Sequence, residues 1–406
     1  MNRKIIKVAV INPFGGSLGH SALYATKICQ SLMESGASVT LFTSMDYNPD
    51  SVISKSNVHY KVEYSSVGDT DKNKKNLKKI SSVISYGYKN IRETLATLKY
   101  FESVNNIVKF DVVHMIGGET ATNVIWGWWF KKFRSRFVNM KIYVTIHNAD
   151  YSFQIYRNQS KIKGIYKLIC RGIFSSYLLR TFDGVMVHGH QAKIDLEDQI
   201  NKQEVSDKIF PINIGISKIQ NKVKNKKSGF ITLLFFGIIR RDKGLDVLLQ
   251  ALSEINSEKI KLKIVGNPSQ IPLEEVVSMV KSSKVERNIS YDLRYIDENE
   301  IPDFFIECDY VILPYYKTFK AQSVVLTLAV QYHKPILCSN VGQNGYDVLK
   351  YELGGVCESE SVGSLSELIN KAISGGIIVP EENFLNYIHD NSWDAIGHKM
   401  IKMYHE

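Results

Sequence analysis

The stretch ITLLFFGIIRRDKGLD, residues 231–246, decides the fold class. Its first six residues form a mainly apolar run of the kind found in strands buried on both faces. A glycine follows, then a short charged segment, and a helical pattern begins near Leu245. A buried strand that leads through a glycine turn into a helix is the repeating unit of a parallel α/β sheet.

The same unit recurs along both halves of the chain. Strand-like runs occupy residues 8–12, 38–43, 111–116, 142–147 and 184–188, and then 231–236, 260–264, 310–313 and 335–338. Helical patterns lie between them. A chain of 406 residues is too long for one core, so two domains are expected. We predict an α/β protein of two doubly wound, Rossmann-like domains that face a central cleft, with ligands beyond the carboxyl ends of the strands.

Domain boundaries follow from a change in composition. Residues 217–228 are polar and rich in lysine, as in a linker or an exposed loop, and residues 71–79 form a second basic loop. We therefore place an N-terminal domain at 1–215, a C-terminal domain at 216–390 and a final segment at 391–406.

Composition narrows the class of protein. The apolar share of 44% and the charged share of 23% are typical of soluble globular proteins, and no apolar run of about 18 residues predicts a spanning helix. The N-terminus lacks the apolar region of a signal peptide. Five cysteines without paired spacing indicate reduced thiols, as in a cytosol, with neither disulfides nor a zinc site.

The net charge of +10 leaves several partners open. Nucleic acid is not expected, because the chain has no zinc-finger, basic-zipper or RNA-binding signature. Anionic small substrates and an anionic membrane surface both fit, and solubility alone is a third explanation.

Three loops that follow strands have features of anion sites. Gly15 and Gly16 permit close backbone approach to a ligand, although a tight turn explains them as well. Arg240 and Lys243 follow a strand and Gly237, so both can face one diphosphate, and we expect the Lys243 side chain to be exposed. Alternatively they form a solvated charge cluster.

The third loop leads into a helix. Residues 320–329 follow the strand at 310–313, and the bare amides of a helix start at Ser323 favour an anion. An ordinary strand–loop–helix connection is the alternative.

These motifs together resemble the C-terminal domain of GT-B glycosyltransferases of family 4. The resemblance rests on FGIIRRDKGLD (236–246), LKIVG (262–266), CDYVILPY (308–315), AQSVVL (321–326), KPIL (334–337) and NVG (340–342). The Gly15–Gly16 loop and residues 145–148 are similar more loosely, and residues 392–406 resemble the family's last helix, which crosses back to the first domain.

The resemblance implies a site for a nucleotide-diphosphate sugar. The catalytic residues it implies are His147, Arg240 and Lys243. The donor-binding residues are Gly15, Gly16, Gly237, Gly266, Tyr295, Ile296, Gln322, Ser323, Val324 and Val325. The nucleotide base would lie against the loop at 294–297, and the backbone amides of residues 323–325 would hold the diphosphate.

The sequence departs from the family pattern at two positions. Many members carry a pair of glutamates where this chain has Lys320 and Leu328. The Gln322-Ser323-Val324-Val325 loop is similar to a subset with a Gln-Ser-Gly-Val type loop. The departure puts the side-chain ligands of the sugar and ribose in doubt.

The histidines differ in the roles that the sequence predicts for them. The resemblance implies that His147 contacts the donor sugar, whereas a packed core histidine is the alternative. His114 is placed at the end of the preceding strand, where a contact with the donor and a packed core position are equally compatible with the sequence. No role is assigned to His188 or His190.

The function implied is that of a retaining, metal-independent hexosyltransferase. It would move a sugar to a glycan or to a polyprenyl-diphosphate-linked saccharide in bacterial surface-polysaccharide synthesis, with no cofactor besides the donor substrate. Two alternatives stay open: an inactive nucleotide-sugar-binding protein and a GT-B nucleotide-sugar epimerase.

We also expect a cytoplasmic protein that is peripheral on the inner face of the plasma membrane. Residues 126–137 mix aromatic side chains with Lys131, Lys132, Arg134 and Arg136, and residues 161–174 place Ile162, Ile165, Leu168 and Ile169 at helical spacing among cations. Such stripes suit a lipid headgroup interface. Helices packed on their sheet, with lysines reaching solvent, are the alternative.

Overall fold

The computed structural model describes residues 5–13, 20–44, 61–65, 79–116, 120–147, 161–201, 203–217, 229–255, 259–268 and 271–406. The chain divides into two compact units. Unit 1 comprises residues 1–212 with Trp393–Glu406, and unit 2 comprises Asn213–Ser392. The last segment therefore belongs with the N-terminal part of the chain, and the chain passes between units after Ile212 and again after Ser392.

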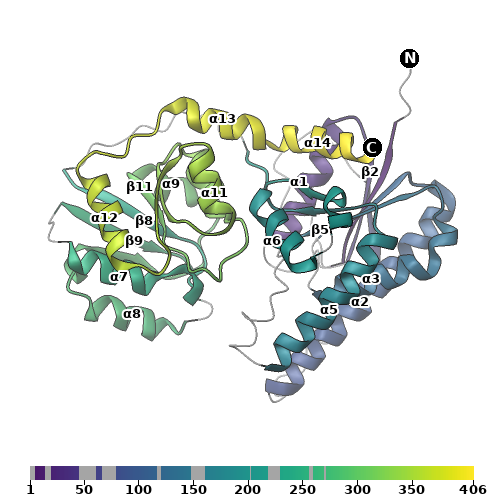
Figure 1. The fold of residues 1–406 in the computed structure, drawn as a ribbon, viewed down its shortest axis with the longest axis horizontal. Helices are drawn as coiled ribbons and strands as arrows, with labels where there is room; N and C mark the ends of the chain where they lie inside the picture. The colour runs from purple at the N-terminus through teal and green to yellow at the C-terminus, as the bar shows by residue number, and fades with distance from the viewer. Residues whose placement is uncertain are drawn as a thin grey trace. The chain divides into compact units, whose positions relative to one another are not determined.

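Unit 1 is built on a seven-stranded parallel sheet (Figure 1). Its strands are β1 (Lys7–Asn12), β2 (Ser38–Ser44), β3 (Lys61–Ser65), β4 (Val112–Ile116), β5 (Lys141–Ile146), β6 (Gly184–Val187) and β7 (Ile209–Pro211). Its helices are α1 (His20–Glu34), α2 (Lys79–Val108), α3 (Thr120–Phe133), α5 (Lys161–Arg180), α6 (His190–Ile200) and α14 (Trp393–His405). The strand order is β3-β2-β1-β4-β5-β6-β7.

Unit 2 repeats the design with six parallel strands (Figure 1). The strands are β8 (Ile231–Phe236), β9 (Ile260–Val265), β10 (Ile289–Asp292), β11 (Tyr310–Leu313), β12 (Ile336–Ser339) and β13 (Gly354–Cys357). The helices are α7 (Leu245–Glu254), α8 (Leu273–Ser282), α9 (Ile301–Glu307), α10 (Val324–Gln331), α11 (Gly342–Lys350), α12 (Val362–Ile373) and α13 (Glu381–Asn391). The order β10-β9-β8-β11-β12-β13 is that of a doubly wound sheet, which confirms the predicted fold class.

The central strands are apolar throughout because both faces of each sheet are covered. In β8, Leu233 and Phe235 join a core with α7, α8 and α12, whereas Leu234 and Phe236 join a core with α9, α10, α11 and α13. In β1, Ala9 contributes to the core beneath α2, α3, α5 and α6, and Val10 to the core beneath α1 and α14. Alternate residues of one strand thus serve different layers.

His114 is a core residue that fastens the C-terminal helix to unit 1. It is the third residue of β4 and fully buried, so the prediction that it ends its strand is wrong. Its Nδ1 hydrogen-bonds the Tyr404 hydroxyl on α14, and its Nε2 lies 2.7 Å from Thr145 Oγ1. Burial lowers the pKa of His114 to about 3, so the ring is neutral at physiological pH.

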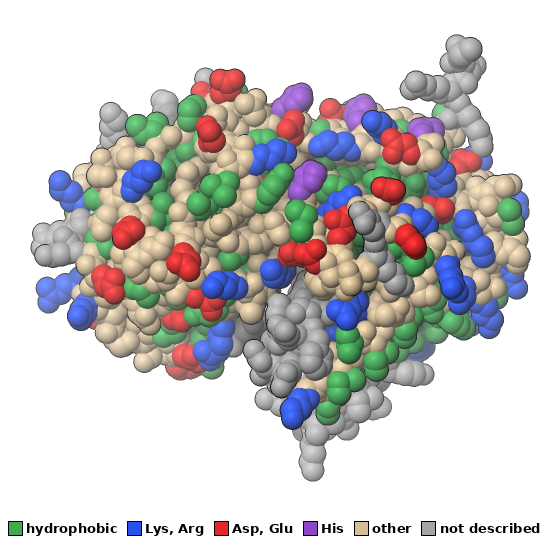
Figure 2. Space-filling view, in the orientation of Figure 1, with side chains coloured by type: hydrophobic (Ala, Val, Ile, Leu, Met, Phe, Trp, Pro, Cys, Tyr) green, Lys and Arg blue, Asp and Glu red, His purple; other side chains and the backbone are tan. Residues whose placement is uncertain are grey.

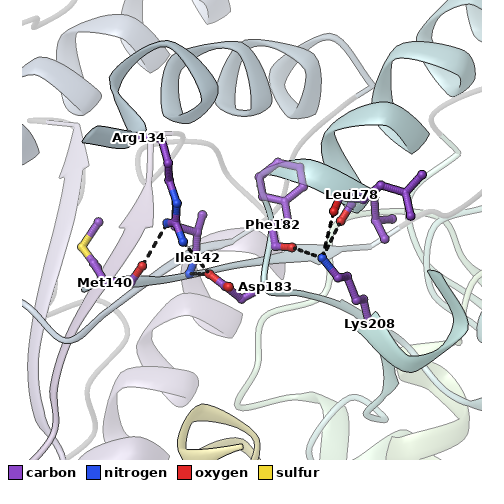
Figure 3. A network of polar contacts seen from close by, with 8 residues as sticks. Arg134, Met140, Ile142, Leu178, Phe182, Asp183 and Lys208 are labelled. Atoms are coloured by element: carbon purple, nitrogen blue, oxygen red, sulfur yellow. Dashed lines mark hydrogen bonds and ion pairs between the residues drawn. The ribbon is translucent and has the colours of Figure 1, made fainter. Parts of the chain in front are cut away.

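A polar network fixes the end of α5 (Figure 3). Lys208 Nζ donates to the carbonyl oxygens of Leu178, Leu179 and Phe182 at 3.3, 3.1 and 3.2 Å. Leu178 and Leu179 lie in the last turn of α5, whose carbonyls have no intrahelical partners, and Phe182 follows the helix. In the same figure, Asp183 accepts from the Ile142 amide at 2.7 Å. The C-terminal half of α5 is therefore tied to the sheet.

The aromatic residues of α3 pack in the core. Trp126, Trp129 and Phe130 are at most 5% exposed, as is Phe137 just beyond the helix. The expectation that these rings sit at a headgroup interface is therefore corrected, because helical periodicity alone does not show which face is buried. Only Trp128 of this stretch is an exposed large hydrophobic residue, at 44%.

Among the described residues, no helix is both long enough and apolar enough to cross a bilayer.

Candidate functional site

The candidate site lies at one edge of the sheet in unit 2. β8 and β11 are neighbours, and their following connections lead to helices on opposite faces of the sheet. This is the topological switch point, where doubly wound sheets bind ligands beyond the carboxyl ends of their strands. The segments that meet there follow β8, β9 and β11.

Gly237 is the point where these segments converge. It follows β8 with φ +97°, a backbone conformation that favours glycine. A Cβ at this position would lie 3.2 Å from Lys243 Nζ and 3.3 Å from Val325 Cγ2. The sequence-predicted residues Gly237, Lys243 and Val325 are therefore neighbours in space.

Gly266 supports Gly237 from the end of β9. Its φ is +135°, and a Cβ there would come within 2.0 Å of the Gly237 carbonyl oxygen. The Gly237 amide donates to the Val265 carbonyl at 2.9 Å, and the Gly266 amide donates to the Asp292 carbonyl at 2.9 Å. Gly266 thus allows two turns to touch at the sheet edge.

Lys243 is buried, contrary to the expectation that it is exposed. It ends the short 3-10 helix Arg241–Lys243 and is 7% exposed, because its chain lies between Gly237 and the Tyr315 ring. Its Nζ lies 5.4 Å from the centroid of that ring. Burial, and then the charge of Arg240, lower the pKa of Lys243 to about 8. Within the described part of the chain, no carboxylate forms an ion pair with it.

Arg240 is already paired. Its Nε and Nη2 donate to the two Asp242 carboxylate oxygens at 3.0 and 2.9 Å. The guanidinium also lies 5.7 Å from the centroid of the Phe319 ring, and its side chain is about one-third exposed. It therefore lies at the rim, beside the buried ammonium of Lys243.

The helix start expected at Ser323 is present, and part of it is used within the chain. Ser323 is the N-cap of α10, and its Oγ accepts from the Val325 amide at 3.2 Å. The Ser323 amide donates to Asn344 Oδ1 at 3.0 Å. Within the described part of the chain, no hydrogen bond engages the Val324 amide, so this amide is available to an acceptor on a ligand.

Asn344 is a residue that the sequence did not single out. It lies on α11, is 1% exposed and binds the Ser323 amide through Oδ1. Its Nδ2 has no partner among the described residues. Buried donors are normally satisfied. The neighbourhood of the α10 start thus holds three donors: the Lys243 ammonium, the Val324 amide and the Asn344 carboxamide.

Gln322 belongs to a buried network rather than to the open side of the loop. Its Oε1 accepts from the Ile214 amide at 2.6 Å, and its Nε2 donates to the Tyr387 hydroxyl at 3.0 Å. The Tyr387 hydroxyl donates to Asp347 at 3.2 Å, and Gln343 donates to the same carboxylate at 2.6 Å. This network ties the loop before α10 to α11, α13 and the segment that enters unit 2.

Replacing Asp347 with asparagine should remove a pH dependence of stability. Burial raises the pKa of Asp347 from 3.8 to about 7. The folded chain therefore holds a proton that the unfolded chain releases, and stability is lost as pH rises from about 4 through about 7. Between pH 5 and pH 8 the free energy of unfolding should fall more in the parent protein than in Asp347→Asn, by roughly 2 kcal/mol.

Urea unfolding at the two pH values measures this difference. Asp303→Asn, at an exposed position on α9, is the matched control and should behave like the parent protein. Equal pH dependence in the parent and Asp347→Asn would contradict the prediction.

Tyr295 and Ile296 lie in the loop after β10. Tyr295 is 68% exposed, and Ile296 packs partly on the core beneath α9 and α13. Arg294 pairs with Glu300 and Asp292, which holds the loop in place. The exposed ring and backbone are compatible with the predicted contact to a nucleotide base, which stays a prediction.

In unit 1, His147 forms part of an aromatic cluster. Its Nδ1 lies 2.7 Å from His188 Nε2, and its ring meets Tyr24 edge-on with centroids 4.8 Å apart. His188 also contacts the Ile212 carbonyl through Nδ1 at 3.3 Å, and burial lowers its pKa to about 3. A neutral His188 therefore orients His147, a role that was not predicted.

Two predicted residues fall outside the described part of the chain. Gly15 and Gly16 lie in the segment 14–19, and Asn148 and most of the lysine-rich linker also lie outside the described residues. Their predicted contacts stay predictions.

Unit 2 is similar to a known protein family. Residues 217–391 match the family described as glycosyl transferases group 1, which covers nearly all of this unit. A GDP-mannose:glycolipid 4-beta-D-mannosyltransferase of Xanthomonas campestris pv. campestris is 30% identical over 105 residues, 26% of this chain and 29% of that protein. An uncharacterized protein in the cps region of Klebsiella pneumoniae is 23% identical over 61% of this chain and 63% of that protein. The chain thus spans less than two thirds of both relatives.

Solved structures show the same fold over the whole chain. A sucrose-phosphate synthase from Thermosynechococcus elongatus superposes with a TM-score of 0.72 at 16% identity, over 98% of each chain. Anabaena HepE, in complex with UDP and glucose, gives 0.68 at 13% identity over 99% of this chain and 100% of that chain. The fold is GT-B, and unit 2 is similar to the glycosyl transferases group 1 family over residues 217–391.

Proposed function

We propose that this protein is a retaining glycosyltransferase that uses a nucleotide-diphosphate sugar. The observation that carries the proposal is the buried Lys243 ammonium, which has no carboxylate partner in the described chain and lies next to Gly237, as does Val325 in the first turn of α10. A buried cation without a neighbouring anion destabilises the fold unless a ligand supplies the anion. A diphosphate has the required charge and accepts from amides at helix starts.

The chemistry needs little beyond positioning and charge. The acceptor hydroxyl forms a bond to the sugar's anomeric carbon while the bond from that carbon to the diphosphate oxygen breaks. The departing phosphate takes the acceptor's proton, so no side-chain base is required. Lys243 and the Val324 amide stabilise the charge that grows on the leaving group. Arg240 would reach it from the rim after leaving Asp242.

The acceptor and the place of the reaction are inferred from chemistry and from relatives. One relative is named for transfer to a glycolipid, and another is named for its place in a cps region. We infer a lipid-linked saccharide, as in bacterial surface-polysaccharide synthesis, and a reaction on the cytoplasmic side of the membrane. His147 is proposed to contact the donor sugar.

A panel of nucleotide sugars with polyprenyl-diphosphate-linked acceptors, read by mass spectrometry, tests the function. One donor should give an acceptor heavier by one hexose, with the anomeric configuration retained. Binding without turnover across the panel would favour a nucleotide-sugar-binding protein. A change of sugar configuration without an acceptor would favour an epimerase.

Metal dependence is measured in the same assay. One Asp-x-Asp pattern, Asp69-Thr70-Asp71, occurs in the sequence and lies outside the described residues. Because the proposal takes its positive charge from Lys243 and Arg240, a chelator should leave turnover unchanged. Loss of turnover in chelator, restored by a divalent cation, would contradict metal independence.

A further inference from the structure

The N-terminal half of α5 exposes an apolar stripe. Of the nineteen large hydrophobic residues that are exposed in the described chain, five fall within eight positions of this helix. They are Ile162 (80%), Ile165 (51%), Tyr166 (44%), Leu168 (40%) and Ile169 (57%). In Figure 2, hydrophobic side chains line the lower edge of unit 1, where α5 and α2 run in Figure 1.

The stripe faces away from the core of its own unit. Ile162, Ile165 and Ile169 follow the spacing of one helix face, whereas Cys170 and Phe174 lie on the other face and are buried. The alternative that this stripe packs on the sheet is therefore wrong. A contiguous exposed apolar face marks an interaction site.

The stripe is held in this orientation by its surroundings. Lys208 fastens the last turn of α5, as Figure 3 shows. Tyr177 packs so closely on α3 that a Cβ at Gly127 would lie 2.1 Å from its ring. Rotation of α5 to bury the stripe would break both contacts, so the apolar face is a fixed surface.

The basic residues around the apolar stripe indicate which partner would cover it. α5 carries five basic residues and no acidic one, and the sequence of α3 likewise has no acidic residue and includes the exposed Lys131 and Lys132. A second copy docked through the same face would bring these cations against themselves, because a two-fold contact pairs a surface with itself. An anionic lipid surface offers an apolar layer beneath negative headgroups, which matches both features.

We propose that the N-terminal half of α5 docks unit 1 on an anionic membrane surface. Ile162, Ile165 and Ile169 would enter the boundary between headgroups and acyl chains, and the lysines of α5 and α3 would meet the headgroups. Docking on a membrane would bring the protein to the lipid-linked acceptor of the proposed function. The observations behind the docking surface come from α5 alone, and the test measures vesicle binding and requires no sugar transfer.

Cosedimentation of the whole protein with vesicles is the test. The probes are vesicles of phosphatidylcholine with phosphatidylglycerol and vesicles of phosphatidylcholine alone. The parent protein should bind the anionic vesicles and be released in part by salt. The double variant Ile165→Glu/Ile169→Glu should bind at least about tenfold more weakly, because two buried aliphatic side chains are lost and two negative charges are added.

Controls separate the possible failures. Ile107→Glu, at a more exposed apolar position on α2, should bind vesicles like the parent protein. Unchanged UDP affinity in the double variant shows that unit 2 is intact. Absence of parent binding to anionic vesicles, equal binding to neutral vesicles, or a dimer that the double variant dissociates would each overturn the proposal. If no nucleotide sugar gave transfer but the protein still bound anionic vesicles, only the proposed function would be contradicted.

Discussion

Replacing Lys243 with methionine is expected to lower turnover of the nucleotide sugar about a hundredfold at neutral pH, the usual cost of one charge-stabilising donor. Methionine keeps most of the volume between Gly237 and Tyr315, so the cavity that alanine would leave is avoided. The measurement is the initial rate at saturating donor, so that the loss reports on the chemical step rather than on binding alone.

The same substitution should make the fold more stable. The pKa of Lys243 is lowered by burial to about 8, below its ordinary 10.5. The folded chain therefore binds this proton less readily than the unfolded chain, and stability is lost as pH falls through about 8. At pH 7 the buried charge is a cost that methionine removes, so the free energy of unfolding should rise by roughly 1–3 kcal/mol. Activity lost with stability gained would mark a functional residue.

The affinity for UDP should also depend on the Lys243 proton. As pH rises from about 7 to about 9, more of the free protein has a neutral Lys243, and UDP binding should weaken. Calorimetric titration across this range measures the trend, which Lys243→Met should lack. Arg241→Met is the matched control, because Arg241 is two-thirds exposed and pairs with Glu275. Near-normal turnover in Lys243→Met would place the diphosphate elsewhere.

Much of the fold could be predicted because both sheets are parallel. Strands covered on both faces read as short apolar runs, and the glycines after them mark turns, so β8 and Gly237 were found from local sequence. The spacing of Arg240 and Lys243 also predicted two neighbouring cations, and the charge of Arg240 does lower the pKa of Lys243. That both face one diphosphate stays a prediction. The burial of Lys243 could not be predicted, since it depends on Tyr315, which is brought in by the pairing of β8 with β11.

The pairing of strands that are distant in sequence also explains why the role of His188 was not predicted. Ile146 of β5 lies opposite Val187 of β6, so the next residues, His147 and His188, leave the sheet side by side. A histidine at the end of each of two strand-like runs was a signal for this pair, but pairing them requires knowledge of the strand order. Asn344 gave no local signal, because its contact with Ser323 joins two separate helix starts. The exposed face of α5 could likewise not be predicted, because the sequence does not show which side of the helix packs on the sheet.

Substituting Gly266 with alanine is expected to damage both the fold and the donor site. The added Cβ would overlap the Gly237 carbonyl oxygen at 2.0 Å, and alanine rarely adopts a φ of +135°. The end of β8 must then move, or the hydrogen bonds that the Gly237 and Gly266 amides donate must break. We expect a loss of about 3 kcal/mol or more in the free energy of unfolding, and UDP affinity at least about tenfold lower in whatever folds, because Lys243 is placed by Gly237.

Gly363 provides the matched control for this prediction. It lies in the first turn of α12, and a Cβ there would meet nothing within 4 Å. Gly363→Ala should therefore stabilise the protein by roughly 0.5–1 kcal/mol, because glycine is a poor helix residue, and should leave UDP affinity unchanged. Urea unfolding and UDP titration of both variants measure the contrast. If Gly266→Ala unfolded like the parent protein and bound UDP equally well, the ends of β8 and β9 would not be in the close contact that places Lys243.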